Sequence, residues 1–159
     1  MREVRDLRTK FPDTTFGRRL EDVGRLLRAS RVLGLKRPVF LFMAGGFTAG
    51  AKRSRTLSAR YQELGQALAA FYEATVEVGL EHQVTTYTDA EFPTPDDRSN
   101  SARGIRIVLG GSVTQPSIVG SEITSDNYNA CLARWYGLSA NDLQHLFPEV
   151  AAPGLEVLA

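Results

Sequence analysis

In the first third of the chain, apolar and polar residues recur with the periodicity of an α-helix. Over residues 16–32 the apolar side chains recur at intervals of three and four, while most arginines fall on the other face. Thr14 and Thr15 offer N-cap oxygens ahead of this segment, and Gly34 is placed to end it. The apolar positions that carry the pattern are Leu20, Val23 and Leu27. We expect an amphipathic helix.

The most regular helical pattern covers residues 57–78, where one face stays apolar for about six turns. Gly79 stands where a C-terminal cap belongs. Two shorter helices are expected further along the chain. Asp126 or Asn127 can cap the first, and Ser139 caps the second, over residues 140–146.

Several segments have the composition of strands. Residues 38–44 form a continuous apolar run, which predicts a strand buried on both faces. Residues 83–87 and 105–109 are rich in β-branched side chains, and residues 117–119 form a shorter candidate. The order of helices and strands predicts an α/β fold, with helices packed on a small, mostly parallel sheet.

This domain is expected over residues 16–150, after a polar, basic lead-in at residues 1–15 and before a tail at residues 151–159. The longest apolar run falls far short of the roughly 20 residues that cross a bilayer. No apolar stretch follows the first residues, so we expect no secretory signal and a cytoplasmic location. The sequence predicts no membrane partner.

The charge is unevenly distributed along the chain. Residues 1–60 hold 15 Lys and Arg against 5 Asp and Glu, whereas residues 61–159 hold 4 against 13. A basic surface for nucleic acid or anionic lipid is one explanation, and attraction between the halves or toward a partner is the other. The basic half has no interleaved aromatics and no nucleic-acid-binding motif, which argues against nucleic acid as the main partner.

Two loops hold candidate chemistry. Residues 45–50 follow the predicted buried strand, and the cations after them could hold an anion at the start of the long helix, although a solvated basic loop is the preferred interpretation. These cations are Lys52, Arg53 and Arg55. An acidic loop could bind a hard cation or act as acid and base, but acidic loops are more often simply solvated. Its carboxylates are Asp89, Glu91, Asp96 and Asp97.

The remaining candidates favour structural roles. His82 and His145 have no catalytic partner at a recognisable spacing, so surface or packing roles are preferred for both. Cys131 is the only cysteine, which excludes an internal disulfide and a multi-cysteine zinc site. We expect it to be a small buried hydrophobic residue.

Seven segments, in this order, are similar to a known protein family: TFGRRL (15–20), GGF (45–47), LGQALAAFY (64–72), QVTT (83–86), EF (91–92), VLGG (108–111) and LARWYGL (132–138). Together they resemble the C-terminal part of the domain of unknown function 1501 family. Members are bacterial proteins of several hundred residues, usually exported by the twin-arginine route, with a fold similar to alkaline phosphatases and sulfatases. The resemblance covers about residues 10–150.

The resemblance implies a metal-dependent hydrolase site, but most of its ligand positions are substituted in this chain. The family motif Gly-Gly-Phe-Asp-Thr-His supplies an aspartate and a histidine, and a later Asp-His-Gly motif and two further histidines follow. The residues at these degenerate positions are Thr48, Gly50, Ser99, Asn100, Ile105 and Arg106. Only the carboxylate of Glu91 is kept. One carboxylate binds a divalent cation weakly, so no metal or other cofactor is expected.

The sequence therefore predicts a non-catalytic, truncated relative of this family, with the scaffold kept and the metal ligands lost. Strands without their neighbours would expose sheet edge and apolar surface, so we expect self-association or a partner chain that completes the sheet. One alternative is a weak metal-dependent hydrolase of phosphate or sulfate esters that uses Glu91 and the acidic loop. The other is an anion or nucleic-acid binder that uses Arg18, Arg19 and the cations of residues 52–55.

Overall fold

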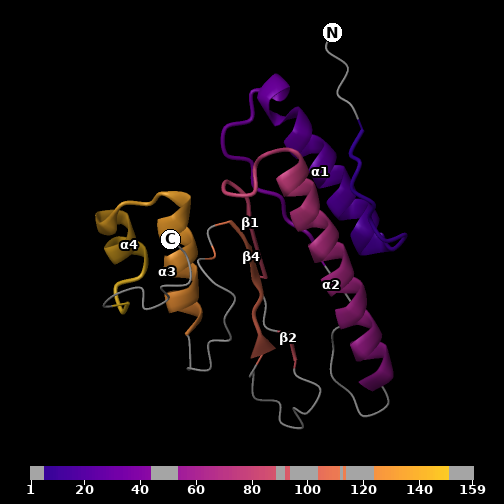
Figure 1. Ribbon diagram of the computed structural model, residues 1–159. Helices are drawn as coiled ribbons and strands as arrows, with labels where there is room; N and C mark the ends of the chain where they lie inside the picture. The colour runs from indigo at the N-terminus through magenta and orange to yellow at the C-terminus, as the bar shows by residue number, and fades with distance from the viewer. Residues whose placement is uncertain are drawn as a thin grey trace. The chain divides into compact units, whose positions relative to one another are not determined.

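A computed structural model gives the arrangement of the chain (Figure 1). It describes residues 6–43, 54–88, 92–93, 104–111, 113 and 124–150. The chain divides into two compact units, Met1–Gly110 (unit 1) and Gly111–Ala159 (unit 2). The predicted strand at residues 117–119, the loop at 45–50 and the tail at 151–159 lie outside the described residues.

Helix α1, Thr15–Leu33, begins and ends within one residue of the predicted segment 16–32. Of the two candidate N-caps, Thr14 is the one used, and its side chain accepts a hydrogen bond from the backbone N–H of Gly17. Gly34 follows in the left-handed conformation, with a φ of 67°. Leu35 N–H then donates to the Ser30 carbonyl at 3.0 Å, which closes a Schellman motif.

Helix α2, Ser54–Glu77, is the long helix that the apolar pattern predicts, extended at its N-terminus. The predicted cap is confirmed, since Gly79 has a φ of 69°. The Gly79 N–H donates to the Val76 carbonyl and the Leu80 N–H to the Thr75 carbonyl, at 3.0 and 2.9 Å. Both long helices of unit 1 therefore end with a left-handed glycine, and in both the residue after it donates a hydrogen bond to the carbonyl five residues earlier.

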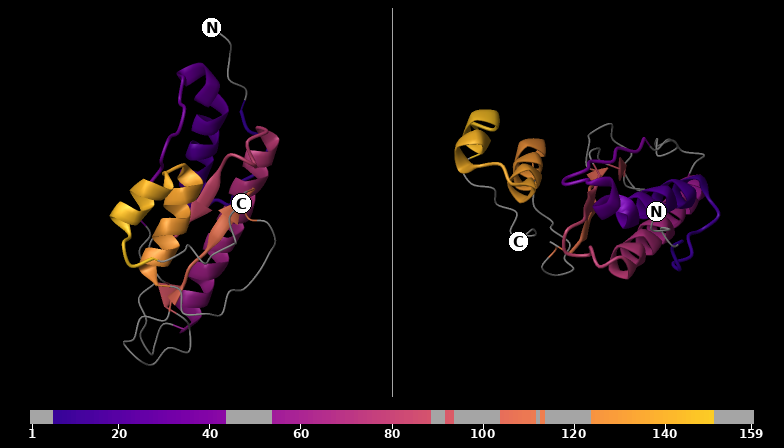
Figure 2. Two further views of the ribbon diagram at one scale, coloured as in Figure 1. Left: turned by 90° about the vertical axis from the view of Figure 1, so that its left-hand side faces the viewer. Right: turned by 90° about the horizontal axis from the view of Figure 1, so that it is seen from above.

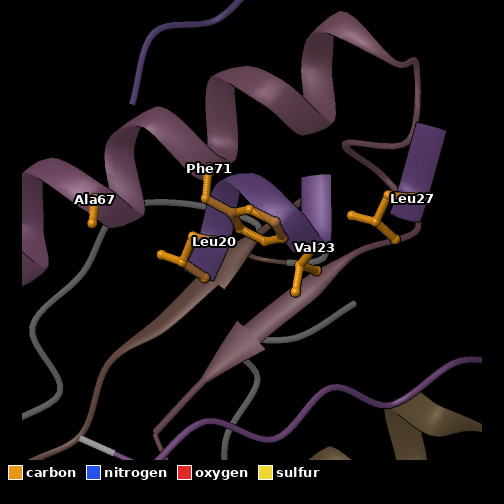
Figure 3. Close-up of a cluster of buried hydrophobic side chains, with 5 residues drawn as sticks. All are labelled: Leu20, Val23, Leu27, Ala67 and Phe71. Atoms are coloured by element: carbon orange, nitrogen blue, oxygen red, sulfur yellow. The ribbon is translucent and has the colours of Figure 1, made fainter. Parts of the chain in front are cut away.

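The core of unit 1 lies between α1 and α2, which run side by side (Figures 1 and 2). It contains the three apolar positions predicted to face inward on α1, together with two side chains of α2 (Figure 3). Ala67 is completely buried, so the helices approach closely at this point. The cluster is Leu20, Val23, Leu27, Ala67 and Phe71.

Residues 6–13 (the lead-in segment) form neither helix nor strand but pack against α1. A Cβ at Gly17 would overlap the Pro12 carbonyl, and one at Gly24 would meet Leu7 Cδ1 at 2.8 Å. The two glycines lie seven residues apart, on one face of α1. Their missing side chains leave the space in which the lead-in segment lies, and Phe11 reaches the core cluster.

The strands pair in the opposite sense to the prediction. Strand β1, Thr85–Tyr87, is antiparallel to β4, Val108–Gly110, with Thr86 opposite Leu109. Strand β2, Phe92–Pro93, is antiparallel to β3, Gly104–Ile105. Helices and strands are both present, as expected, but the mostly parallel sheet is wrong for the described residues. Parallel neighbours need a crossover connection, usually helical, and the sequence between β1 and β4 has no helical pattern.

The segment at residues 38–43 also differs from the prediction. It is not part of either strand pair. Its side chains alternate, with Phe40 packed against the core cluster while Val39, Leu41 and Met43 are 71%, 82% and 85% exposed. The predicted strand buried on both faces is therefore wrong. Of this segment only Phe40 packs against the core, and Phe42 is 36% exposed.

The described residues of unit 2 form two short helices. Helix α3, Ser125–Tyr136, uses Thr124 as its N-cap, so the predicted caps at Asp126 and Asn127 are wrong by two or three residues. Helix α4, Ala140–Leu146, has the predicted cap at Ser139. The Asp142 carboxylate accepts from the Ser139 backbone N–H while Ser139 Oγ accepts from the Asp142 N–H, which completes a capping box.

Replacing Phe71 with alanine should destabilise unit 1 by about 3 kcal/mol, because it leaves a cavity at the contact between the two long helices. The matched control is Tyr72→Ala, one residue along, where the side chain is 37% exposed. We expect the control to cost less than about 1 kcal/mol. Urea unfolding followed by far-ultraviolet circular dichroism measures both, and equal losses would contradict the assignment of the core.

Candidate functional site

Most residues of the predicted hydrolase site and of the predicted anion site lie outside the described residues. These are Thr48, Gly50, Lys52, Arg53, Asp89, Glu91, Asp96, Asp97, Ser99 and Asn100. Arg55 belongs to the first turn of α2, Ile105 is paired with Phe92 in β3, and Arg106 is half-buried between β3 and β4.

The remaining candidate side chains, two histidines and one cysteine, lie in positions that favour structural roles. His82 is exposed just after α2, with Nε2 at 3.9 Å from Glu81 Oε1, and His145 is exposed in the last turn of α4. Cys131 is buried on α3, as expected. In the part of the chain that the structure describes, no group of three or more His, Cys, Asp or Glu side chains could hold a metal ion.

A buried carboxylate that the sequence reading missed lies at the end of α2. The Glu77 side chain is 7% exposed and accepts hydrogen bonds from three residues. Its oxygens accept from the backbone N–H groups of Arg8 and Thr9, from the Thr9 hydroxyl, and from Arg28 Nη1, all within 2.9 to 3.0 Å. This network (the Glu77 clasp) joins the lead-in segment, α1 and α2.

The hydrogen bonds of the clasp change the acidity of Glu77. The backbone N–H of Arg8, followed by the Thr9 and Arg28 donors, lowers the pKa of this carboxyl from 4.5 to about 2, against the opposing effect of burial. Because donors already fill the accessible positions on both oxygens, the ionised carboxylate has no room for a substrate. The clasp is a structural element of unit 1.

A signal for the clasp was present in the sequence. Glu77 is the last residue of α2, where the helix dipole disfavours a negative charge. An acidic residue at that position needs cations or N–H donors from elsewhere in the fold. The partners Arg8 and Arg28 are 69 and 49 residues away in sequence, so the spacing alone could not identify them.

Four of the five arginines of α1 donate to acceptors within unit 1. Arg18 Nη1 lies 2.6 Å from Asp13, and Arg25 Nη2 lies 2.8 Å from Glu21 on the next turn. Arg19 donates to the Met43 carbonyl at 3.2 Å, and Arg28 belongs to the clasp. Asp13 and Glu21 already count in the charge balance of residues 1–60, so among these contacts only Glu77 lowers the excess of positive charge.

The largest unexplained feature of unit 1 is apolar. Val39, Leu41 and Met43 (the apolar strip) are three exposed side chains at alternate positions of a segment that forms neither helix nor strand. Lys36 and Arg37 are exposed immediately before it. Four neighbouring side chains in the same stretch are also exposed, namely Val32, Leu33, Leu35 and Phe42. A concentration of this kind is typical of an interaction surface.

The comparisons with known proteins give no relative from which to assign a function. No family model, curated protein or solved structure matches the chain. The resemblance to the domain of unknown function 1501 family stays a prediction from its motifs. Among the described residues, no helix is long and apolar enough to span a membrane.

We expect Glu77→Gln to lower the free energy of unfolding by about 1–2 kcal/mol at neutral pH. The lowered pKa of Glu77 alone corresponds to ~3 kcal/mol, but solvent near the exposed Arg8 screens the clasp and reduces this contribution. A lowered pKa stabilises the folded state fully above about pH 4.5, and this contribution disappears as the pH falls toward 2. The variant should therefore show a flatter dependence of stability on pH between 2 and 4.5.

Chemical denaturation at several pH values measures this change. The matched control is Glu73→Gln, which neutralises an exposed carboxylate one turn earlier on the same helix. We expect the control to keep the pH dependence of the wild type. An identical profile for Glu77→Gln and wild type would show that the clasp does not contribute to folding.

Proposed function

We propose that this chain is a non-catalytic binding or assembly module that associates with another polypeptide through the apolar strip. One observation carries the proposal. The segment at residues 38–43 has the composition of a strand covered on both faces, yet only Phe40 reaches the core while Val39, Leu41 and Met43 face solvent. Something other than unit 1 would complete its burial.

Burying the apolar strip would contribute favourable free energy to an association. Covering an exposed Val, Leu or Met contributes about 1.5–3 kcal/mol each, so the strip offers on the order of 5 kcal/mol to an association. The end of the segment is held in place, because Arg19 of α1 donates to the Met43 carbonyl and Phe40 is packed on the core. A segment already positioned in this way loses less conformational entropy when it binds.

The absence of catalysis is inferred from the sequence. In the family that the motifs resemble, the scaffold is similar to alkaline phosphatases and the metal ligands are aspartates and histidines. Thr48, Gly50, Ser99 and Asn100 have no imidazole or carboxylate to offer in their place. The chain is thus proposed to be a pseudoenzyme in which a hydrolase scaffold serves for binding.

Neither alternative gains support from the described residues. The hydrolase alternative depends on Glu91 and an acidic loop outside them. The anion-binding alternative depends in part on Arg18 and Arg19, whose guanidinium groups already donate to acceptors within unit 1. Neither is therefore proposed as a second function.

Metal content tests the non-catalytic part of the proposal. After incubation with zinc, manganese, magnesium and calcium followed by desalting, we expect elemental mass spectrometry to find no retained metal, because only one family ligand is kept. Near-stoichiometric metal would contradict the proposal. Loss of that metal in Glu91→Ala would then locate the site in the acidic loop.

The apolar strip is tested by an environment-sensitive apolar dye at low protein concentration. We expect the wild type to enhance the dye's fluorescence and Leu41→Ser to lower that enhancement about twofold, since Leu41 is 82% exposed. The control is Leu26→Ser, which changes an exposed leucine on α1 outside the strip. Equal signals from wild type and Leu41→Ser would contradict the strip as a binding surface.

A further inference from the structure

We propose that the lead-in segment is a detachable strap. Residues 6–13 leave the helix pair together while α1 and α2 stay packed on each other, and the Glu77 clasp sets how often this happens. When closed, the strap covers a recess between the two helices, so it controls access to that recess. This inference depends neither on the apolar strip nor on the proposed function.

The hydrogen bonds that hold the strap converge on one pair of side chains. The strap forms neither helix nor strand, and its Arg8 and Thr9 amides donate to the Glu77 carboxylate at 2.9 to 3.0 Å. Arg28 Nη1 donates to the Asp6 carbonyl and to Glu77 Oε1, both at 2.9 Å. Because these attachments share one carboxylate and one guanidinium, we expect them to break together.

Two apolar side chains of the strap fill the recess. A Cβ at Gly24 of α1 would lie 2.8 Å from Leu7 Cδ1 and 3.8 Å from Phe11 Cζ. The Cβ of Ala74 on α2 is 3.7 Å from the same point. Leu7 and Phe11 therefore meet where Gly24 has no side chain and the facing residue of α2 has a short one. Both are half-buried, whereas Ala74 beneath them is 1% exposed.

The helix pair keeps its own core when the strap opens. The five buried side chains of the cluster in Figure 3 all belong to α1 or α2, and Phe11 packs against them as a partly buried side chain. The N-cap of α1 also stays in place, since Thr14 accepts from the N–H of Gly17 on the same helix. Opening therefore needs backbone changes only before Thr14, and it is a smaller event than the unfolding of unit 1.

Opening changes what unit 1 presents to solvent. Ala74 and Glu77 lie one turn apart on α2, and Gly24 and Arg28 lie one turn apart on α1, so the recess adjoins the Glu77–Arg28 ion pair. With the strap closed, these two charged side chains are only 7% and 26% exposed. With the strap open, they stand at one end of an apolar recess. A group that binds there shifts the population toward the open strap.

Amide hydrogen exchange of the full chain, measured by nuclear magnetic resonance, tests the proposal at the Arg8 and Thr9 amides. We expect these amides to exchange about tenfold faster in Glu77→Gln than in wild type, and at the wild-type rate in Glu73→Gln. The residues that flank positions 8 and 9 and set their intrinsic exchange rates are the same in all three proteins. Equal rates in Glu77→Gln and wild type would overturn the proposal, because Glu77 would then not hold the strap.

A second variant distinguishes opening of the strap from unfolding of the whole unit. Leu64→Ala removes a side chain that is 6% exposed, at a position about 20 Å from Glu77 along α2. We expect it to speed exchange at the buried Phe71 by at least about tenfold and to leave the Arg8 and Thr9 amides unchanged. If exchange at Arg8 and Thr9 rises by the same factor as at Phe71, the strap opens only when unit 1 unfolds, and the proposal is wrong.

Urea makes the same distinction in the wild type, without a substitution. A strap of residues 6–13 exposes little surface when it opens, whereas unfolding of unit 1 exposes its core. Exchange at Arg8 and Thr9 should therefore rise less steeply with urea than exchange at Phe71. Equal slopes would overturn the proposal.

Discussion

Unit 1 depends on the close contact between α1 and α2. The two antiparallel ladders have only three and two residue pairs, and so short a two-stranded ribbon is not stable alone in water. Its stability must come from packing on the helices, and the helix pair provides that surface through the cluster around Ala67 and Phe71. Val84, just before β1, packs against the same cluster, which connects the ribbon to the helices.

The lead-in segment adds a second constraint to the same helix pair. Gly17 and Gly24 let its backbone and Leu7 lie against α1, while Glu77 binds Arg8 and Thr9 from the end of α2. The clasp places a negative charge where the helix dipole opposes it, and it compensates with N–H donors and the Arg28 guanidinium. A polar segment that sequence composition describes as an irregular arm is thus fixed in position by one carboxylate and two absent side chains.

The sequence predicted local features correctly, but not the features that depend on contacts between distant parts of the chain. Helices α1 and α2 and their glycine caps followed from periodicity and from the conformational freedom of Gly34 and Gly79. The direction of strand pairing did not, since parallel and antiparallel strands share the same local propensities. The partners of Glu77 were hidden for the same reason, and the predicted ligand positions around Thr48 and Asn100 lie outside the described residues.

The apolar strip shows how a wrong expectation can still be informative. A continuous run of apolar residues predicts a strand covered on both faces. This pattern does not say whether the covering groups belong to the same folded unit or to another polypeptide. Phe40 satisfies it on one face by packing on the cluster between α1 and α2. On the other face Leu41 is 82% exposed, so the composition of the segment and its environment in unit 1 disagree. An additional polypeptide on that face removes the disagreement, which is why the strip, and no charged cluster among the described residues, supports the functional proposal.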